Sequence, residues 1–459
     1  MAALRVLLWW DTEDFINPES DDALLLLLRE HRKRGVPATW KMVGEKTRVL
    51  RERGRSDVIE LLSDALFDVG YHTDFHSVHP TIAEYTEHCD WQEGVAEILA
   101  RETDGLRLTA ETFGKPVLCY GQPGASYTPH AYGAMRVWEV PCYVGGSVYL
   151  GLADRPSYLM GRLTVGWLGR ASCSFPAREG ERAYERAVKT MEGHLASPPA
   201  GGLVSEGNHP NEWSAAEWWD VVNFLDGANP LREDWKPAPL YERARVEEMA
   251  ALFGRYLDWL LEHGVEPVSL GELFRLYGPG DYLLDGETAR AAAREWAAGR
   301  VSFHFDEASG KSFSAAQLLL GLVALLVEGK EEVAVPEVDP PTAAADTVPL
   351  AAPLGREAVE GAARWLLARV RAAGSLPPRV VLPSGGRVRL EDFAAACAAC
   401  YLGAEPPSGP AEFVPAGMVR RYGRDVGPWP VHHPDFSGEN LHRLTCCLAW
   451  SFKPAVRLG

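Results

Sequence analysis

Hydrophobic and polar positions in the first 275 residues alternate between short apolar runs and helical patterns. Short apolar runs bounded by turn residues predict buried β-strands. A helix over about 20–34 separates the first two runs, with acids in its first turn and bases in its last. The predicted strands cover residues 4–10, 36–43, 67–71, 116–120, 142–149, 163–167, 202–206 and 266–269. Repeated strand–helix units predict an α/β fold with a parallel sheet, whose ligands meet the carboxyl ends of the strands.

Residues 278–459 differ in composition and contain two units that look alike. Each unit has the pattern helix, hairpin, helix, and their first helices are predicted over 287–298 and 357–372. The stretch of about 329–355 between the units holds five prolines and is typical of a linker. We therefore predict an α/β domain over 1–277 and a smaller C-terminal α+β module over 278–459. We expect the module to pack against the first domain or to form a homo-oligomer.

Charge and cysteine content narrow the classes of partner. Acidic residues outnumber basic residues by 63 to 46, a net charge of −17, and such a field repels nucleic acids and anionic membrane surfaces. The longest apolar run, 318–327, is about half of the roughly 20 residues that a membrane-spanning helix needs. Eight cysteines in 459 residues are no disulfide framework, and no signal-peptide cleavage site follows the first apolar run. We expect a cytoplasmic protein that binds a small molecule or an oligosaccharide.

Carboxylates and imidazoles gather where the first and third predicted strands end. Asp11, Glu13 and Asp14 follow the first strand, and His72 and His76 follow the third. Two imidazoles at i and i+4 on a helical turn can share one metal ion. Acids in a row need solvent or a cation to offset their repulsion, although they are also common at helix starts. Because the strand ends can face one mouth, a carboxylate and two histidines predict a divalent metal site, with Zn²⁺ as the first choice.

Five segments in a particular order extend this interpretation. They are WDTEDF, ATWKMVGE, DVGYHTDFHSVHPT, GQPGASY and VSEGNHPNEW, spread over about residues 4–275. Their order resembles the polysaccharide deacetylase (NodB homology) family, carbohydrate esterase family 4 and its relatives. The resemblance implies a distorted (β/α) barrel of about seven strands. It also implies hydrolysis of an acetamido group on a sugar.

The resemblance implies a role for several residues. Asp11 matches the general base, and His209, which follows the strand at 202–206, matches the group that protonates the leaving amine. His72 and His76 match the metal histidines, and either Glu13 or Asp14 matches the metal-binding acid. The backbone N–H of Gly124 would help to bind the oxyanion. In addition, we expect substrate contacts from Gln122, Tyr127 and Trp213.

Gly121 departs from the family pattern. It stands where the family has an arginine that pairs with the catalytic aspartate. Gln122, Arg136 or another distant cation would have to replace that guanidinium. Gly121→Arg could restore the pairing if the loop tolerates a side chain there. Without a fixed cation, we expect the pKa of Asp11 to be less depressed than in ordinary family members.

The sequence thus predicts a metal-dependent amide hydrolase that removes an acetyl group from an N-acetylated sugar or a similar amide. Two alternatives are a non-catalytic carbohydrate-binding relative and a metal-independent hydrolase of small cyclic amides on the same fold. Since every candidate ligand precedes Val265, we expect the C-terminal module to be dispensable for metal binding.

Overall fold

The computed structural model of the chain describes residues 3–146, 148–169, 179–344 and 353–458. These residues form two compact units. Unit 1 comprises Met1–Pro156, Thr164–Leu276 and Arg421–Leu441, and unit 2 comprises Ser157–Leu163, Tyr277–Arg420 and His442–Gly459.

Unit 1 is built on a sheet of strands that run parallel from β5 to β8. The order of the strands is β7-β5-β4-β3-β2-β1-β8, and the short β9 pairs with the start of β1. One hydrogen bond, from Ser205 N in β8 to Leu168 O after β7 (3.2 Å), joins the two ends of this path. The predicted distorted barrel of about seven strands is therefore confirmed. Its strands are β1 (Arg5–Thr12), β2 (Ala38–Met42), β3 (Phe67–Tyr71), β4 (Val117–Tyr120), β5 (Cys142–Val144), β7 (Arg162–Val165), β8 (Leu203–Asn208) and β9 (Glu266–Pro267).

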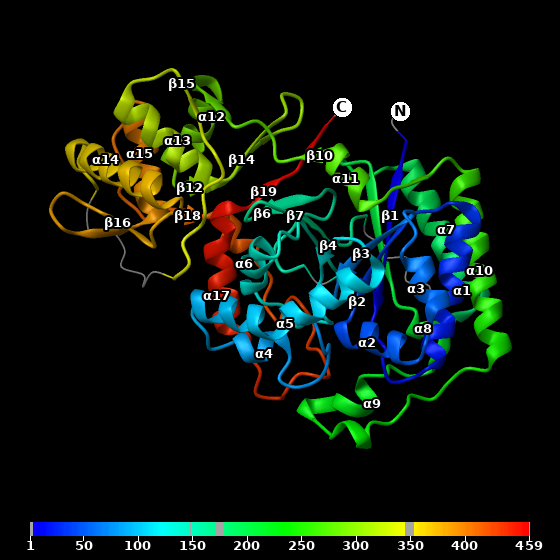
Figure 1. The fold of residues 1–459 in the computed structure, drawn as a ribbon. Helices are drawn as coiled ribbons and strands as arrows, with labels where there is room; N and C mark the ends of the chain where they lie inside the picture. The colour runs from blue at the N-terminus through cyan, green and yellow to red at the C-terminus, as the bar shows by residue number, and fades with distance from the viewer. Residues whose placement is uncertain (1–2, 147, 170–178, 345–352, 459) are drawn as a thin grey trace. The chain divides into compact units, whose positions relative to one another are not determined.

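Helices connect the strands and cover the outside of the sheet. Figure 1 shows α1, α7 and α10 side by side along one flank of unit 1. Gly35 ends α1 in the left-handed conformation (φ 63°), which a residue without a side chain adopts at no steric cost. The helices of unit 1 are α1 (Glu19–Arg34), α2 (Gly44–Glu52), α3 (Ser56–Leu62), α4 (Ile82–Thr86), α5 (Trp91–Phe113), α6 (His130–Val137), α7 (Glu181–Ala196), α8 (Asn211–Ser214), α9 (Val221–Phe224), α10 (Arg243–Glu262) and α11 (Leu270–Leu276).

The alternation of side chains along β1 separates the helix-covered face from the barrel interior. Leu8 and Trp10 lie in the hydrophobic cluster under the helices, where Trp10 stacks on Trp40. Trp9 and Asp11 therefore point to the other side, into the barrel. Gly207 is needed there, because a Cβ at that position would lie 2.1 Å from the indole of Trp9. The strand thus ends with acidic side chains at the mouth of a filled barrel.

Unit 2 has its own hydrophobic core and contains two arrangements of helix, hairpin and helix. The first consists of α12 (Gly286–Ala297), the hairpin of β13 (His304–Asp306) with β14 (Lys311–Phe313), and α13 (Ala315–Glu328). The second consists of α14 (Arg356–Ala373), the hairpin of β16 (Arg379–Val381) with β17 (Arg387–Arg389), and α15 (Leu390–Tyr401). The remaining short elements are β6 (Ser157–Leu159), β10 (Tyr277–Gly278), β11 (Leu283–Asp285), β12 (Arg300–Val301), β15 (Glu332–Ala334), β18 (Glu412–Phe413), α16 (Val414–Gly417), α17 (Glu439–Leu448), β19 (Lys453–Pro454) and β20 (Val456–Arg457), of which α17 spans the division between the units.

The division of the chain differs from the prediction in three places. Ser157–Leu163 belongs to unit 2, although we placed it in the first domain. Arg421–Leu441 belongs to unit 1, although we placed it in the C-terminal module. The predicted linker is also partly wrong, because β15 pairs with β11 inside it and Val335 is buried in the core of unit 2. Residues 345–352 of that linker lie outside the described residues. Proline content alone misled here, since prolines next to short edge strands are compatible with order.

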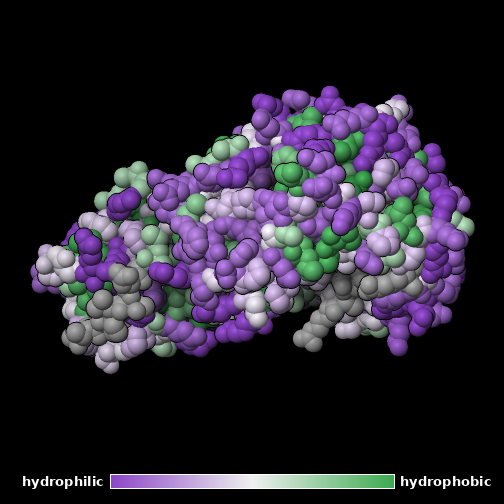
Figure 2. Space-filling model, turned by 90° about the horizontal axis from the view of Figure 1, so that it is seen from below, coloured by the Kyte–Doolittle hydropathy of each residue, from purple (hydrophilic) through white to green (hydrophobic). Residues whose placement is uncertain are grey.

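Polar side chains dominate the surface. The face shown in Figure 2 is largely hydrophilic, with smaller hydrophobic areas between the polar ones. Such a surface suits a chain with 24% charged residues.

Within the described residues, no helix combines the length and the apolar character that crossing a lipid bilayer requires.

Candidate metal centre and active site

Glu13, His72 and His76 meet at the carboxyl end of the barrel and are here called the Glu13 cluster. One ligand atom from each lies within 4.8 Å of the other two, and all three residues are buried. Glu13 Oε2 is 2.8 Å from His76 Nε2 and 3.7 Å from His72 Nε2. Neither Nε2 atom forms a hydrogen bond with any residue that the structure describes. Apart from their contact with Glu13, the two nitrogens have no partner among the described residues, and this favours a ligand that the chain itself does not supply.

Each residue of the Glu13 cluster is oriented by a second residue. The indole of Trp219 donates to Glu13 Oε1 (3.2 Å). His72 Nδ1 lies 2.9 Å from Gly121 O. Because a carbonyl can only accept, Nδ1 carries the hydrogen and the lone pair of the neutral ring remains on Nε2. Such partners hold the imidazoles of metal sites in the correct tautomer.

The orientation of His76 depends on a chain of two hydrogen bonds. The hydroxyl of Ser77 donates to Asp220 Oδ2 (3.1 Å), so it can only accept from His76 Nδ1 (2.5 Å). His76 therefore also presents the lone pair of Nε2 to Glu13. Two imidazole nitrogens and one carboxylate oxygen form a ligand set that catalytic zinc sites use. The donor set and the partnerless nitrogens fit a divalent metal ion.

The spacing of the two histidines predicts a helical turn. This prediction is wrong, because the pair lies in a loop. Residues 72–78 form a loop after β3, in which Thr73 (φ 64°) and His76 (φ 52°) adopt left-handed conformations. Such conformations are strained for residues with side chains, and they persist only where the surroundings enforce them. Backbone N–H groups at the start of α2 bind the loop, through Gly44 N to Thr73 O (3.0 Å) and Glu45 N to Asp74 O (2.8 Å). These hydrogen bonds and left-handed conformations bring the imidazoles of His72 and His76 together.

Asp11 is held by Lys41, a residue that the sequence analysis did not assign to the site. Lys41 Nζ lies 2.6 Å from Asp11 Oδ1 and donates to Val144 O (2.8 Å), and its side chain is fully buried. The two residues are neighbours in the register of β1 and β2. Burial favours the neutral form of Asp11, but the neighbouring His72 and the ammonium of Lys41 more than offset it. With a further contribution from His209, the pKa of Asp11 lies below its ordinary value.

Lys41 also explains the glycine at position 121. A Cβ there would lie 2.5 Å from Lys41 Nζ and 2.3 Å from Val144 O. Lys41 thus occupies the space that a side chain at position 121 would need. Our expectation that Gly121→Arg could restore the ion pair is wrong, and Lys41, rather than Gln122 or Arg136, supplies the cation.

His209 follows β8 and reaches the same mouth. Its Nε2 lies 3.5 Å from Asp11 Oδ2, and its Nδ1 lies 3.4 Å from Glu212 Oε2. Burial lowers the pKa of His209, but the carboxylates of Glu13 and Asp11 raise it well above the ordinary value. His209 can therefore hold a proton at neutral pH. This is the state that a general acid requires.

A cavity of about 270 Å³ opens on these groups. Pockets for drug-sized ligands occupy about 300–1,000 Å³, so this one suits a small ligand. Two indoles take part in its wall, and Trp218 is 38% exposed. The lining residues are Glu13, His76, Gly124, His209, Trp218, Asp220, Val221, Trp429 and Pro430.

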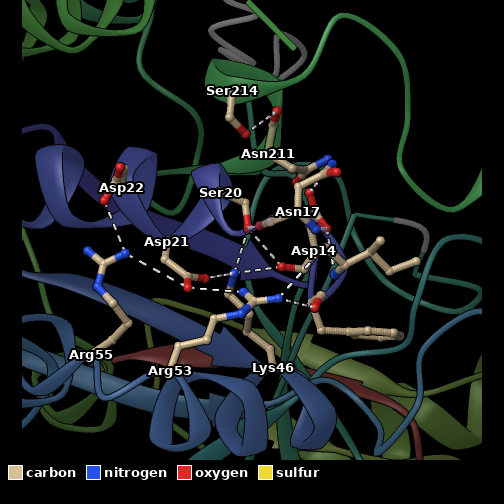
Figure 3. Close-up of polar contacts among 12 residues, drawn as sticks. Asp14, Asn17, Ser20, Asp21, Asp22, Lys46, Arg53, Arg55, Asn211 and Ser214 are labelled. Atoms are coloured by element: carbon tan, nitrogen blue, oxygen red, sulfur yellow. Dashed lines mark hydrogen bonds and ion pairs between the residues drawn. The ribbon is translucent and has the colours of Figure 1, made fainter. Parts of the chain in front are cut away.

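Asp14 belongs to a separate group of polar residues, the Asp14 cluster, which comprises Asp14, Asn17, Ser20, Asp21, Lys46 and Arg53 (Figure 3). Asp14 Oδ1 accepts from the backbone of Ile16 and Asn17, and Oδ2 accepts from the amide of Asn17. Burial is the main reason why the pKa of Asp14 rises to about 6. Of the two metal-acid candidates, Glu13 faces the imidazoles, whereas Asp14 binds the turn that precedes α1.

The three predicted substrate contacts lie in different surroundings. Trp213 is fully buried in the core of unit 1, 5.4 Å from the ring of Trp10, so its prediction as a substrate platform is wrong. Trp213 lies within the short helix α8 after β8, and its indole has apolar neighbours under the sheet rather than at its mouth. Tyr127 is buried and stacks on Tyr149 at 4.3 Å. Gln122 is buried one residue before Pro123 and is not part of the cavity wall.

Sequence reasoning missed Lys41, Ser77, Asp220 and the cavity residue Trp429. It named Trp218 only as one of several tryptophans that could stack on a sugar. Lys41 did carry a signal, because it is a lone charge in the apolar run ATWKMV. A lysine in a buried strand needs a buried partner, which directs attention to the acids of the neighbouring strand. Trp429 carried no signal, since it lies more than 200 residues from the other motifs.

Comparisons with known proteins were made by sequence and by structure. No protein-family model and no curated protein matches the chain. A carbohydrate esterase family 4 pseudoenzyme from Bacillus anthracis is similar in structure, with 13% identity and a TM-score of 0.32 over 59% of this chain and 65%, just under two thirds, of that chain. The peptidoglycan deacetylase PdaC from Bacillus subtilis is similar with 12% identity and a TM-score of 0.32 over 60% of this chain and 91% of that chain.

A third similar structure is the Xyl-CE4 domain of a multidomain xylanase from the hindgut metagenome of Trinervitermes trinervoides. It shares 11% identity and a TM-score of 0.31 over 60% of this chain and 91% of that chain. The solved structures to which this chain is similar thus include a peptidoglycan deacetylase and proteins of carbohydrate esterase family 4, the family that the order of the sequence motifs resembles.

Proposed function

We propose that the protein is a metal-dependent hydrolase that removes an acetyl group from an N-acetylated sugar or a similar amide. The observation that carries the proposal is the Glu13 cluster, in which two buried imidazole nitrogens without hydrogen bonds face one carboxylate oxygen. Zinc is the metal that we propose, because His, His and carboxylate ligands suit it. When bound, such an ion would activate water and polarise the carbonyl oxygen of the amide.

Asp11 has the surroundings of a general base. Its Oδ1 is occupied by Lys41, which leaves Oδ2 to accept a proton from the attacking water. The ammonium of Lys41 keeps the carboxylate charged and fixes its orientation. Because Lys41 is itself anchored by Val144 O, the carboxylate cannot easily rotate away. Asp11 is thereby prepared for proton transfer before substrate binds.

His209 has the complementary properties. It holds a proton at Nε2, lies in the cavity wall, and can donate that proton to the nitrogen that leaves as an amine. Gly124 lines the same cavity, where its N–H would stabilise the oxyanion. An acid and an oxyanion donor in the wall of one small cavity, with a base next to the acid, are the groups that amide hydrolysis requires. The Asp11–Lys41 pair beside His209 favours the hydrolase over a protein that only binds sugars.

The experiment is a comparison of metal-free and zinc-loaded protein on a panel of acetamido sugars, with acetate release as the measurement. We expect release only from the zinc-loaded protein. Glu13→Gln should lose both zinc and activity, whereas Asp14→Asn, the matched change at the next residue, should retain zinc. Turnover by metal-free protein would contradict the metal dependence. Tight binding of the sugars without acetate release would favour the non-catalytic alternative.

A further inference from the structure

The cavity has a wall that comes from the far end of the chain. Trp429 and Pro430 belong to the segment Arg421–Leu441, which returns to unit 1 after the intervening residues have formed most of unit 2. The indole of Trp429 lies on Gly124, where a Cβ would be 2.5 Å from the ring. It also meets the ring of His76 edge to face, with 5.6 Å between the centroids. Trp429 therefore covers both the Glu13 cluster and the loop of the proposed oxyanion donor.

Hydrogen bonds on both sides of Trp429 fix this wall. Pro430 O accepts from Asp226 N (2.9 Å), and Val431 O accepts from Gly227 N (3.1 Å). Val431 is fully buried against a cluster that includes Trp219, the residue that orients Glu13. The wall is thus continuous with the support of the site.

Two acids after the histidine loop anchor the rest of the segment. Glu84 accepts from His433 N (2.8 Å). Glu87 Oε1 accepts from Ser437 N (3.1 Å) and Gly438 N (2.7 Å). Charge-assisted hydrogen bonds of this kind are strong. The segment is therefore part of the barrel mouth rather than a lid that opens for each substrate.

The wall restricts what can reach the reactive groups. Glu13 and His76 are each only 4% exposed, and Asp11 is 6% exposed. An enzyme that deacetylates a polymer needs room for the rings on both sides of the sugar that carries the acetyl group. Here the cavity is about 270 Å³, and two indoles in its wall offer apolar surfaces to a single ring.

We propose that the substrate is a small N-acylated molecule of one sugar ring, not a polysaccharide, and that Trp429 is the residue that sets this limit. The proposal rests on the proposed hydrolase function and names the substrate class of that same site. A longer oligosaccharide needs space beyond this cavity of about 270 Å³, and the Trp429 indole occupies part of its wall. Selection by size then follows from the fixed wall.

The test uses N-acetylglucosamine and its β-1,4-linked oligomers of two, three and four rings with the full-length, zinc-loaded protein. We expect kcat/KM for acetate release to be highest for the single ring and to fall at least about tenfold for the trimer. Trp429→Ala should move the trimer-to-monomer ratio of kcat/KM upward by about tenfold. The matched control Trp91→Ala, which changes an indole at the start of α5 outside the cavity, should leave the ratio unchanged.

Two results would overturn the proposal: a kcat/KM that rises with each added ring in the wild-type protein, or an unchanged ratio in Trp429→Ala. Should Trp429→Ala fail to fold, the length series of the wild-type protein decides alone. If none of the four compounds releases acetate, calorimetric binding of the same series separates the two proposals. Affinity for one ring that does not grow with length supports the small cavity and refutes only hydrolysis. Affinity that grows with length, or no binding at all, overturns the substrate class.

Discussion

Glu13 and Asp14 are consecutive acids in two clusters of opposite kinds. In the Asp14 cluster, both carboxylate oxygens of Asp14 accept hydrogen bonds from amides, and Asp21 pairs with Lys46 and Arg53. In the Glu13 cluster, one carboxylate oxygen faces two imidazole nitrogens that have no hydrogen bond among the described residues. Density of charge therefore does not distinguish a binding site from a structural network. A single buried atom without a hydrogen bond does not distinguish them either, since Asn17 Oδ1 of the Asp14 cluster is one. What separates the two clusters is a pair of imidazole nitrogens that face the same carboxylate oxygen.

One buried lysine belongs to the Asp14 cluster, and another lies at the barrel mouth. Lys46 Nζ binds Asp21, Ser20 and the carbonyl of Asp14, and so joins the start of α1 to α2. Lys41 Nζ binds Asp11 and Val144 O at the barrel mouth. The first lysine ties two elements together. The second fixes one oxygen of a carboxylate and leaves the other directed at His209. A buried pair of lysine and aspartate thus stabilises the fold in the first case. In the second case it orients a carboxylate for the proposed reaction.

The largest effect that tests this comparison is loss of the metal. His72→Ala and His76→Ala should each reduce zinc affinity by more than the 10–100-fold that removal of an outer-shell partner typically costs, and should abolish hydrolysis. The fold should remain, because each change removes one hydrogen bond of the barrel mouth, from Nδ1 to Gly121 O or to Ser77 Oγ, and none of the hydrophobic core. Metal analysis and circular dichroism measure both outcomes. His79→Ala is the control, since His79 pairs with Glu84 outside the cluster. Full zinc occupancy in the two variants would exclude the Glu13 cluster as the metal site.

The two lysines offer the next contrast. Lys41→Met should lower kcat roughly a hundredfold, because Asp11 loses the cation that orients it as a base, and Lys41→Arg should recover part of the loss. Lys46→Met should lower the free energy of unfolding by about 3 kcal/mol, the low end for a broken buried pair, since Arg53 still pairs with Asp21. Its kcat per folded molecule should not change. Urea titration and acetate release separate the two effects, and a normal kcat in Lys41→Met would remove Lys41 from the active site.

Two serines allow a finer comparison. Ser77→Ala removes the hydroxyl that holds His76 Nδ1, and zinc affinity should fall about 10–100-fold. Ser20→Ala removes a hydroxyl of similar burial from the Asp14 cluster and should cost about 1–3 kcal/mol of stability without changing zinc affinity. Competition with a chromophoric chelator measures the affinity. Equal zinc affinities in the two variants would mean that the Ser77–Asp220 chain does not support the site.

The sequence was sufficient for the barrel and for the residues at its mouth. Apolar runs gave β1, β2 and β3 to within about three residues, because buried parallel strands need continuous apolar sequence. The segments around Asp11, His72 and His209 could be placed at strand ends for the same reason. The spacing of the two histidines does not predict the backbone conformation between His72 and His76. The left-handed conformations of Thr73 and His76 are not visible in the local pattern of hydrophobic and polar residues.

The features of the site that the sequence did not predict depend on contacts between distant segments. Gly121 suggested a missing cation, yet the replacement comes from β2 and is visible only once β1 and β2 are in register. Similarly, Trp213 and Trp429 cannot be told apart by composition. Trp213 packs under the sheet, and Trp429 reaches the cavity from Arg421–Leu441. A deletion of residues 280–459 would therefore remove part of unit 1, contrary to our expectation that everything after 277 is a separate module.

The smallest expected effect concerns His31, a buried histidine whose two ring nitrogens both form hydrogen bonds. It tests the comparison on a histidine that is not part of the Glu13 cluster. Trp10 Nε1 donates to His31 Nε2 (3.2 Å), and His31 Nδ1 donates to Val36 O (3.1 Å). Burial lowers the pKa of His31 to about 3, whereas the unfolded chain titrates near 6.5. Between these values the unfolded chain binds a proton that the folded chain does not. The free energy of unfolding should therefore fall as pH falls below 6.5, by roughly 1.4 kcal/mol per pH unit, or about 2 kcal/mol at pH 5.

Urea titrations of metal-free protein at pH 7, 6 and 5 measure this contribution as the difference between the wild-type protein and His31→Gln. The difference removes the titration of His72, His76 and His209, which both proteins share. His263→Gln, a change at an exposed histidine, is the control and should follow the wild-type protein at each pH. Identical pH dependence in the wild-type protein and His31→Gln would show that a fully hydrogen-bonded buried histidine does not store this energy. The absence of partners at His72 and His76 Nε2 would then be a weaker sign of a metal site, because satisfied and unsatisfied imidazoles would differ less in their energetics than their surroundings indicate.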